Sequence, residues 1–235
     1  MVGDFNRDGN LDLVSVPGTG PGVFGIFLGN GDGTFKHLRN YNPRAFPLVS
    51  ADFNGDGILD LALEGDGGYG IYVMLGNGDG TFQKPKKVIS LKKHSLAGMF
   101  VTDFNGDGKA DLACGERDQN NGKIWVALGN GDGTFKKPTS IRIENGIYGF
   151  SFAVGDFNSD GKTDVVADYL VSDTESEFAL FLGNGDGAFQ PKKLVHIGGG
   201  PHEGDLGTVP ADFNSDGLLD FIIQDPGQVV VVLQK

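Results

Sequence analysis

The sequence predicts an all-β fold, a β-propeller of about five blades with roughly four antiparallel strands each and a last blade that is short of strands. Three observations predict it. An acidic nine-residue motif recurs five times, a glycine-rich motif follows it in four units, and short apolar runs lie between the two. No segment carries apolar residues at helical spacing for more than a turn or two, which excludes a helical fold.

The acidic motif defines the repeat. Its first copy, residues 4–12, reads Asp-Phe-Asn-Arg-Asp-Gly-Asn-Leu-Asp, and the other copies occupy residues 52–60, 103–111, 156–164 and 212–220. Their first aspartates are 48, 51, 53 and 56 residues apart. A period of about 50 residues is typical of a β-propeller blade, whereas an open β-solenoid usually has shorter repeats.

The second motif is Leu-Gly-Asn-Gly-Asp-Gly-Thr-Phe, at residues 28–35, 75–82 and 128–135, with Ala188 in place of Thr at residues 182–189. Its Gly, Asn and Asp residues tolerate positive φ, which tight β-hairpins require. The motif therefore predicts a hairpin in each of four units.

The strands are predicted around these two motifs. Apolar runs rich in β-branched and aromatic residues follow the acidic loops and precede the hairpins. They occupy residues 11–16, 59–63, 110–114, 163–167 and 218–223 after the loops, and 23–28, 71–75, 124–128, 178–182 and 229–233 before the hairpins. One further strand follows each hairpin Phe and another precedes each acidic loop.

About four strands per unit is the dimension of a propeller blade. An open β-solenoid is the alternative. The Phe at the second loop position is expected to pack between neighbouring blades.

We predict one domain over residues 1–235, with repeat units at 1–46, 47–96, 97–148, 149–206 and 207–235. The fifth unit contains no hairpin motif, so we expect either a three-stranded blade or a longer natural array. Residues 1–3 lead directly into the first loop and contain no signal peptide.

Charge and composition exclude several function classes. The net charge of −12 disfavours nucleic acid and adsorption to anionic membranes. Cys114 is the single cysteine, so an intrachain disulfide and a thiolate metal site are both excluded. No apolar run approaches the ~20 residues that span a bilayer, so membrane insertion is not expected.

The acidic loops predict calcium sites, because Ca²⁺ takes six to eight oxygen ligands. Alternate loop residues at positions 1, 3, 5 and 9 carry side-chain oxygens. Position 7 is so variable that only its backbone carbonyl can be a shared ligand, and Gly at position 6 permits the bend. The predicted ligands are Asp4, Asn6, Asp8, Asn10 and Asp12; Asp52, Asn54, Asp56, Ile58 and Asp60; Asp103, Asn105, Asp107, Lys109 and Asp111; Asp156, Asn158, Asp160, Lys162 and Asp164; and Asp212, Asn214, Asp216, Leu218 and Asp220.

The charge balance agrees with this prediction. Three aspartates in each of five loops give 5 × 3 = 15 carboxylates, and five Ca²⁺ ions would change −12 to −2. Without metal, the clustered carboxylates would repel one another.

The Asp-Phe-Asn-x-Asp-Gly-x-x-Asp loops and the Leu-Gly-Asn-Gly-Asp-Gly-Thr-Phe hairpins resemble the FG-GAP and VCBS repeats of integrin α-subunit propellers and many secreted bacterial proteins. The likeness covers essentially the whole chain. It implies a calcium-binding propeller that serves in adhesion, as a lectin-like module or beside an enzyme. Integrin propellers have seven blades, whereas this chain offers five units.

Several residues outside the repeated motifs could serve a function specific to this protein. His196, His202, Glu203 and Asp205 suggest an irregular inter-blade loop, with a second metal or acid/base site as the alternative. Asp173, Glu175 and Glu177 suggest a solvated acidic loop. Tyr72 and Trp125 suggest blade packing, with a sugar platform as the alternative. Arg39, Tyr41 and Arg44 lie on the first inter-blade connection, where they could face a ligand.

The sequence favours a non-enzymatic, calcium-binding module that presents loops to a protein or glycan. A propeller-type polysaccharide lyase is the competing class, with His202, Tyr148, Tyr169 and Arg117 as scattered candidates. A purely structural spacer is the third. Because loops of this kind are expected to bind calcium at about 10⁻⁴–10⁻³ M, the range of extracellular modules, we expect an extracellular or cell-surface location.

Overall fold

The computed structural model describes residues 1–16, 22–68, 70–91, 95–118, 121–143, 150–170, 176–195, 209–225 and 228–232. The chain divides into two compact units. The first contains residues 1–94, 109–111 and 129–136, and the second contains residues 95–108, 112–128 and 137–235. No helix among the described residues is long and apolar enough to cross a membrane. The prediction of a single domain stays a prediction.

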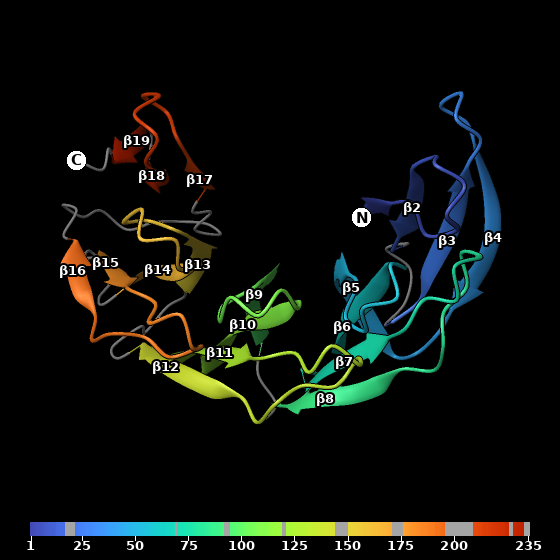
Figure 1. The fold of residues 1–235 in the computed structure, drawn as a ribbon, viewed down its shortest axis with the longest axis horizontal. Coiled ribbons are helices and arrows are strands. Elements are labelled where there is room, and N and C mark those ends of the chain that lie inside the picture. Colours follow the sequence, from blue (N-terminus) through green and yellow to red (C-terminus); the bar gives the residue numbers. More distant parts are fainter. Residues whose placement is uncertain are drawn as a thin grey trace. The chain divides into compact units, whose positions relative to one another are not determined.

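The described structure is all-β, as predicted, and its strands form antiparallel sheets of consecutive strands (Figure 1). The first sheet has the order β1-β2-β3-β4 and the second β5-β6-β7-β8. Their bounds are β1 (Val2–Gly3), β2 (Asp12–Ser15), β3 (Phe24–Gly29) and β4 (Phe35–Tyr41), then β5 (Ala45–Ala51), β6 (Asp60–Gly65), β7 (Gly70–Met74) and β8 (Lys86–Ser90).

Two further four-stranded sheets and one of three strands follow. The third sheet holds β9 (Ser95–Thr102), β10 (Asp111–Asp118), β11 (Asn121–Ala127) and β12 (Thr139–Ile143). The fourth holds β13 (Phe150–Gly155), β14 (Asp164–Leu170), β15 (Ser176–Phe181) and β16 (Lys193–Val195). The fifth holds β17 (Val209–Ala211), β18 (Asp220–Asp225) and β19 (Gln228–Val232).

Each sheet places the two sequence motifs at fixed points. The acidic loop joins the first strand to the second, and the glycine-rich motif joins the third strand to the fourth where a fourth is present. In the first hairpin the Asn30 amide donates to the Thr34 carbonyl (3.0 Å), and Gly31 and Gly33 adopt φ of 77° and 85°. The predicted hairpins are therefore confirmed, together with the physical reason for their glycines.

The cores lie between successive sheets. In the first unit, one cluster joins the first two sheets: Phe5, Val14, Phe24, Ile26, Leu61, Leu63, Met74 and Phe82. In the second unit, a larger cluster joins the third and fourth sheets: Phe104, Ile124, Val126, Phe152, Val165, Ala167, Tyr169, Ala179 and Phe181. Leu219 of the fifth repeat packs against a further cluster on the fourth sheet.

The Phe at the second loop position packs between successive repeats, as predicted, and in the first three loops its ring meets the hairpin Phe of the next repeat. The ring centroids of Phe5 and Phe82 are 5.7 Å apart at an edge-on angle of 65°. Phe53 and Phe135 are also 5.7 Å apart, and Phe104 and Phe189 are 6.0 Å apart. Phe157 of the fourth loop is 1% exposed, whereas the equivalent Phe213 in the fifth loop is 42% exposed.

Candidate metal-binding loops

The first aspartate of each acidic loop is held by backbone amides of its own loop. Asp4 Oδ1 accepts a hydrogen bond from the Asp8 amide (3.2 Å), and Asp4 Oδ2 accepts one from the Gly9 amide (2.9 Å). The same pair of bonds recurs at Asp52, Asp103, Asp156 and Asp212. The backbone is thereby curled around one carboxylate.

This curl requires left-handed backbone at two positions. Position 6 is Gly in all five loops, with φ between 76° and 87°. Position 4 is left-handed as well, although it is Gly in only the second and third loops. Arg7, Ser159 and Ser215 adopt φ of 62°, 57° and 63° there. The motif revealed the need for glycine at position 6, whereas the variable residue at position 4 concealed a second strained site.

The side chains at positions 3 and 5 meet each other. Asn6 Nδ2 donates to Asp8 Oδ2 (2.9 Å), and Asn6 Oδ1 accepts from the Asp8 amide (3.0 Å). The same Asn–Asp contact spans 2.8–3.2 Å in the other four loops. Positions 1, 3 and 5 are thus linked through the amide of position 5, which contacts the oxygens of both other side chains.

The aspartate at position 9 is fully buried in all five loops. Asp12 Oδ2 accepts from the Phe5 amide and Asp12 Oδ1 from the Gly29 amide, both at 2.9 Å. Both bonds recur at Asp60 and Asp164. The bond from the hairpin amide is seen at Asp111, and the bond from the Phe amide is seen at Asp220. The position-9 carboxylate therefore ties the start of the loop to the hairpin of its own sheet, a structural role that the motif did not reveal.

The side chain at position 7 contacts the hairpin of its own repeat. A Cβ added to Gly78 would lie 3.1 Å from Ile58, and one added to Gly185 would lie 3.2 Å from Lys162. Asn10 and Lys109 occupy the same place beside Gly31 and Gly131. This contact accommodates side chains of different chemistry, which is consistent with a shared ligand role for the carbonyl alone.

The carboxylates of one loop act on each other electrostatically. Burial raises the pKa of Asp60 to about 6, against the lowering effect of the Gly76 and Phe53 amides, and the charges of Asp56 and Asp52 raise it further. Burial raises the pKa of Asp164 as well, again with a contribution from Asp160 and Asp156. In the second and fourth loops, the carboxylates at positions 1, 5 and 9 are therefore close enough for their negative charges to destabilise one another.

The donor chemistry of the loops fits a hard divalent cation. Each loop offers carboxylate, amide and carbonyl oxygens, and Ca²⁺ prefers such ligands. A carboxylate oxygen has two lone pairs, so the position-9 aspartate can keep its amide contacts and still face a cation. Within the described residues, no three His, Cys, Asp or Glu side chains stand in a metal-binding arrangement by themselves. Asparagine and carbonyl oxygens would therefore have to complete each set.

The aromatic residues considered as sugar platforms are each engaged by neighbours. The Lys87 amine lies 5.4 Å from the centre of the Tyr72 ring. Trp125 Nε1 donates to Glu116 (2.7 Å), and the Lys123 amine lies 5.4 Å from its ring. These contacts favour the blade-packing interpretation over a free stacking surface.

On the first connection, the Arg39 guanidinium lies over the Tyr41 ring at 5.2 Å, and Arg44 adopts a left-handed φ of 55°. Tyr41 itself stacks on Phe24, with ring centroids 5.2 Å apart. Arg39 and Tyr41 therefore pack against other residues of this chain.

Of the residues predicted as candidates for a lyase, Tyr169 is the one whose side chain lies within the described part of the chain. Tyr169 is fully buried, and its hydroxyl donates to Glu177 (2.7 Å) and accepts from the Lys192 amine (3.0 Å). Arg117 lies on β10. The remaining candidates lie outside the described residues: Tyr148, His196, His202, Glu203 and Asp205. Asp173 and Glu175 of the predicted solvated acidic loop also lie outside them.

Comparison with known proteins identifies the repeat. The family model described as an FG-GAP-like repeat matches four overlapping stretches, residues 4–63, 52–114, 103–167 and 166–223. No curated protein matches the chain.

Two solved structures match the chain. The Tc holotoxin pore of Photorhabdus luminescens is 22% identical with a TM-score of 0.52, and the match covers 98% of this chain and 11% of that one. A rhamnogalacturonan lyase of Bacillus licheniformis is 13% identical with a TM-score of 0.45, over 86% of this chain and 49% of that one. The present chain thus spans about half or less of the length of these structures, and the first likeness concerns the fold alone.

Proposed function

Since the chain belongs to the FG-GAP-like repeat family, we propose that it is a non-enzymatic β-propeller of about five blades, stabilised by calcium, that binds a protein or glycan. Five Ca²⁺ ions would be held by side-chain oxygens at loop positions 1, 3, 5 and 9 and by the carbonyl at position 7. A bound ion would supply positive charge beside the three carboxylates of each loop, and the asparagine and carbonyl oxygens would complete its ligand set.

The observation that carries the calcium proposal is the electrostatic coupling within single loops. Asp60 has its pKa raised by burial and, in part, by the charges of Asp56 and Asp52. Such a cluster is unfavourable by itself and becomes favourable around a divalent cation. The raised pKa is seen in the second and fourth loops, and the amide-held geometry at position 1 recurs in all five loops.

The propeller proposal is supported by the way successive repeats pack within each compact unit. The Gly80 amide donates to the Phe5 carbonyl (3.0 Å), and the Gly133 amide donates to the Phe53 carbonyl (2.9 Å). Together with the paired Phe rings, these bonds join the loop of one repeat to the hairpin of the next. A sheet with two apolar faces must be covered on both sides, and a ring of sheets achieves this.

A structural calcium would place the protein outside the cell. Sites of extracellular modules bind calcium at about 10⁻⁴–10⁻³ M, and only an external medium keeps such sites filled.

The ligand assignment is tested by calorimetric titration of calcium into metal-free protein. Asp216→Ala removes a proposed side-chain ligand of the fifth loop, and we expect the number of sites to fall from five to four. Leu218→Ala keeps the proposed carbonyl ligand of the same loop and should retain all five. An equal loss in both variants would contradict the ligand assignment, because a leucine side chain has no oxygen to lose.

A further inference from the structure

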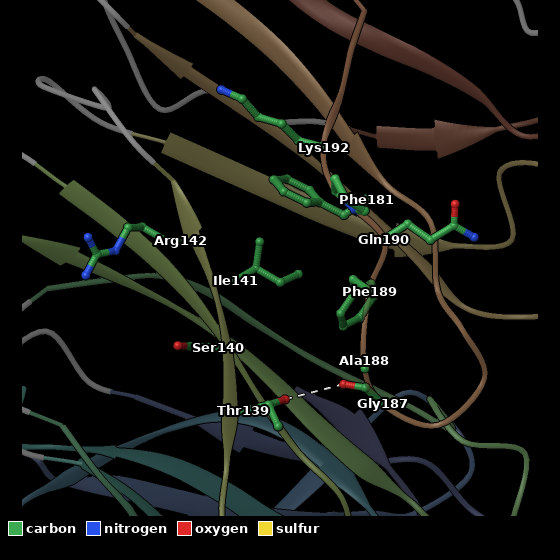
Figure 2. A pocket seen from close by; sticks show the side chains of 11 residues that line it. Thr139, Ser140, Ile141, Arg142, Phe181, Gly187, Ala188, Phe189, Gln190 and Lys192 are labelled. Carbon is green, nitrogen blue, oxygen red and sulfur yellow. Dashed lines mark hydrogen bonds between the residues drawn. The ribbon is translucent and has the colours of Figure 1, made fainter.

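A cavity of about 540 Å³ opens between β12 of the third sheet and the segment that follows the hairpin of the fourth sheet. Figure 2 shows Thr139 and Ile141 on the side of β12 that faces Phe181 and Phe189, whereas Ser140 and Arg142 lie on its other side. This alternation follows the two-residue period of a strand. The side chains that face each other across the cavity are therefore mainly apolar.

The corresponding place between the first and second sheets is filled by Tyr41. Tyr41 pairs with Phe24, four residues before the hairpin Leu, and Ile141 pairs with Ile124, also four residues before the hairpin Leu. The two residues are thus equivalent positions on the fourth strand of their sheets. Ile141 is half-buried and has neither a ring nor an oxygen.

Tyr41 makes contacts that Ile141 cannot make. Its hydroxyl accepts a hydrogen bond from the Phe82 amide (2.8 Å), and its ring meets that of Phe82 edge-on at 6.0 Å. Phe189 is the equivalent of Phe82 in the fourth repeat and lines the cavity. Within the described part of the chain, the Phe189 amide has no hydrogen-bond acceptor corresponding to the Tyr41 hydroxyl. Next to Phe189, the cavity therefore lacks the aromatic ring and the hydroxyl oxygen that Tyr41 supplies next to Phe82.

We propose that this cavity binds the phenol ring of a tyrosine side chain that a partner protein presents in an extended segment. The ring would lie against Ile141 and Phe189, and its hydroxyl oxygen would accept the Phe189 amide, as Tyr41 does at Phe82. The cavity exceeds the volume of one phenol ring several-fold, so the flanking backbone of the partner also fits. This inference deepens the proposed role as a binding module by naming its site and partner class.

The polar groups at the cavity argue against other ligands. The Thr139 hydroxyl already donates to the Gly187 carbonyl (3.3 Å). The Lys192 amine already donates to the Tyr169 hydroxyl and lies 3.5 Å from the Glu177 carboxylate, so an added anion gains little from it. A sugar ring would bring several hydroxyls to a mainly apolar wall and leave them unpaired. A phenol has one polar atom and needs one partner.

The test uses the whole chain with saturating calcium and a capped peptide, Gly-Gly-Tyr-Gly-Gly, followed by amide-detected NMR. We expect the Phe189 amide signal to shift with the Tyr peptide, and binding to be about 2- to 10-fold tighter than that of the Phe peptide, which lacks the hydroxyl. Free p-cresol should compete with the Tyr peptide, and methyl glucoside should not. The proposal would be overturned by binding of p-cresol but not of the Tyr peptide, by a failure of p-cresol to compete, by equal binding of both peptides, or by an unshifted Phe189 amide.

Ile141→Tyr supplies the ring and the oxygen from within the chain, so we expect it to abolish peptide binding and to raise the melting temperature. Ile141→Phe is the second filling variant, for use if Ile141→Tyr does not fold. The reverse change, Tyr41→Ile, should open a second site at Phe82. Retained peptide binding in a folded, cavity-filled variant would also overturn the proposal. Failure here is distinct from failure of the calcium proposal, because calcium dependence is read from melting and not from peptide binding.

Discussion

Replacing Asp60 by Ala should destabilise the protein strongly even without metal. Its carboxylate is fully buried and accepts the amides of Phe53 (2.9 Å) and Gly76 (2.8 Å). Alanine leaves both buried amides without a partner, and each such loss costs about 1–3 kcal/mol. We therefore expect Asp60→Ala to lower the free energy of unfolding by about 2–6 kcal/mol.

Asp56→Ala in the same loop is the matched control. Asp56 accepts the Ile58 amide and the Asn54 side-chain amide at an exposed position, where water can replace the lost carboxylate. Without metal, the loss should stay within about 1 kcal/mol.

The assay is urea denaturation at pH 7, followed by circular dichroism, with chelator and again with millimolar calcium. With chelator, only Asp60→Ala should lower the unfolding midpoint substantially. With calcium, both variants should lose the stabilisation contributed by that loop. Equal effects of the two substitutions under chelator would refute the structural role assigned to position 9.

Three further outcomes are expected. Phe5→Ala should lower the free energy of unfolding by about 3–5 kcal/mol, because the ring is 1% exposed. Phe213→Ala should lower it far less, because that ring is 42% exposed. Equal losses of stability in urea denaturation would contradict the packing described. Burial raises the pKa of Asp168 from 3.8 to about 7, so its contribution to stability is present below about pH 4 and is lost as the pH rises through 7. Asp168→Asn should flatten this dependence and raise the melting temperature at pH 8, and an unchanged pH profile would exclude the carboxyl as its source. Ser159→Gly should raise the free energy of unfolding by about 0.5–1 kcal/mol by relieving a left-handed φ of 57°, and denaturation would show a loss if that conformation were unstrained.

The repeated motifs made much of the fold predictable. Gly at position 6 and in the hairpin reports a local backbone requirement, and local requirements are visible in a single sequence. The Phe at position 2 was predicted to pack between repeats, because it recurs beside a loop at a fixed phase. Both expectations are confirmed by the positive φ values and the buried rings.

The dual role of position 9 was hidden because the same residue type serves both purposes. An aspartate that closes a metal loop and one that accepts two buried amides look identical in sequence. The second role of Asp12, accepting two buried amides, is visible only in the folded structure. There Phe5 and Gly29, which are 24 residues apart in the sequence, lie on either side of its carboxylate. The left-handed backbone of Arg7 was hidden for a similar reason, because Arg is not a residue that signals positive φ.

The ligand proposed for the cavity rests on a comparison of Tyr41 with Ile141, which the sequence alone does not suggest. Tyr41 on β4 and Ile141 on β12 are recognised as equivalent only through the register of their strands. The pairing of β3 with β4 also contains a bulge beside Ile26, which shifts the spacing in the sequence. Spacing alone gives no sign that one repeat fills a place that another leaves open.

The most direct test of calcium stabilisation is a pair of thermal melts of the whole chain, one with chelator and one with millimolar Ca²⁺. Each filled site should add about 2.7 kcal/mol at a hundredfold excess of calcium over its dissociation constant. We predict a markedly higher melting temperature with calcium, and identical melting curves would contradict the account.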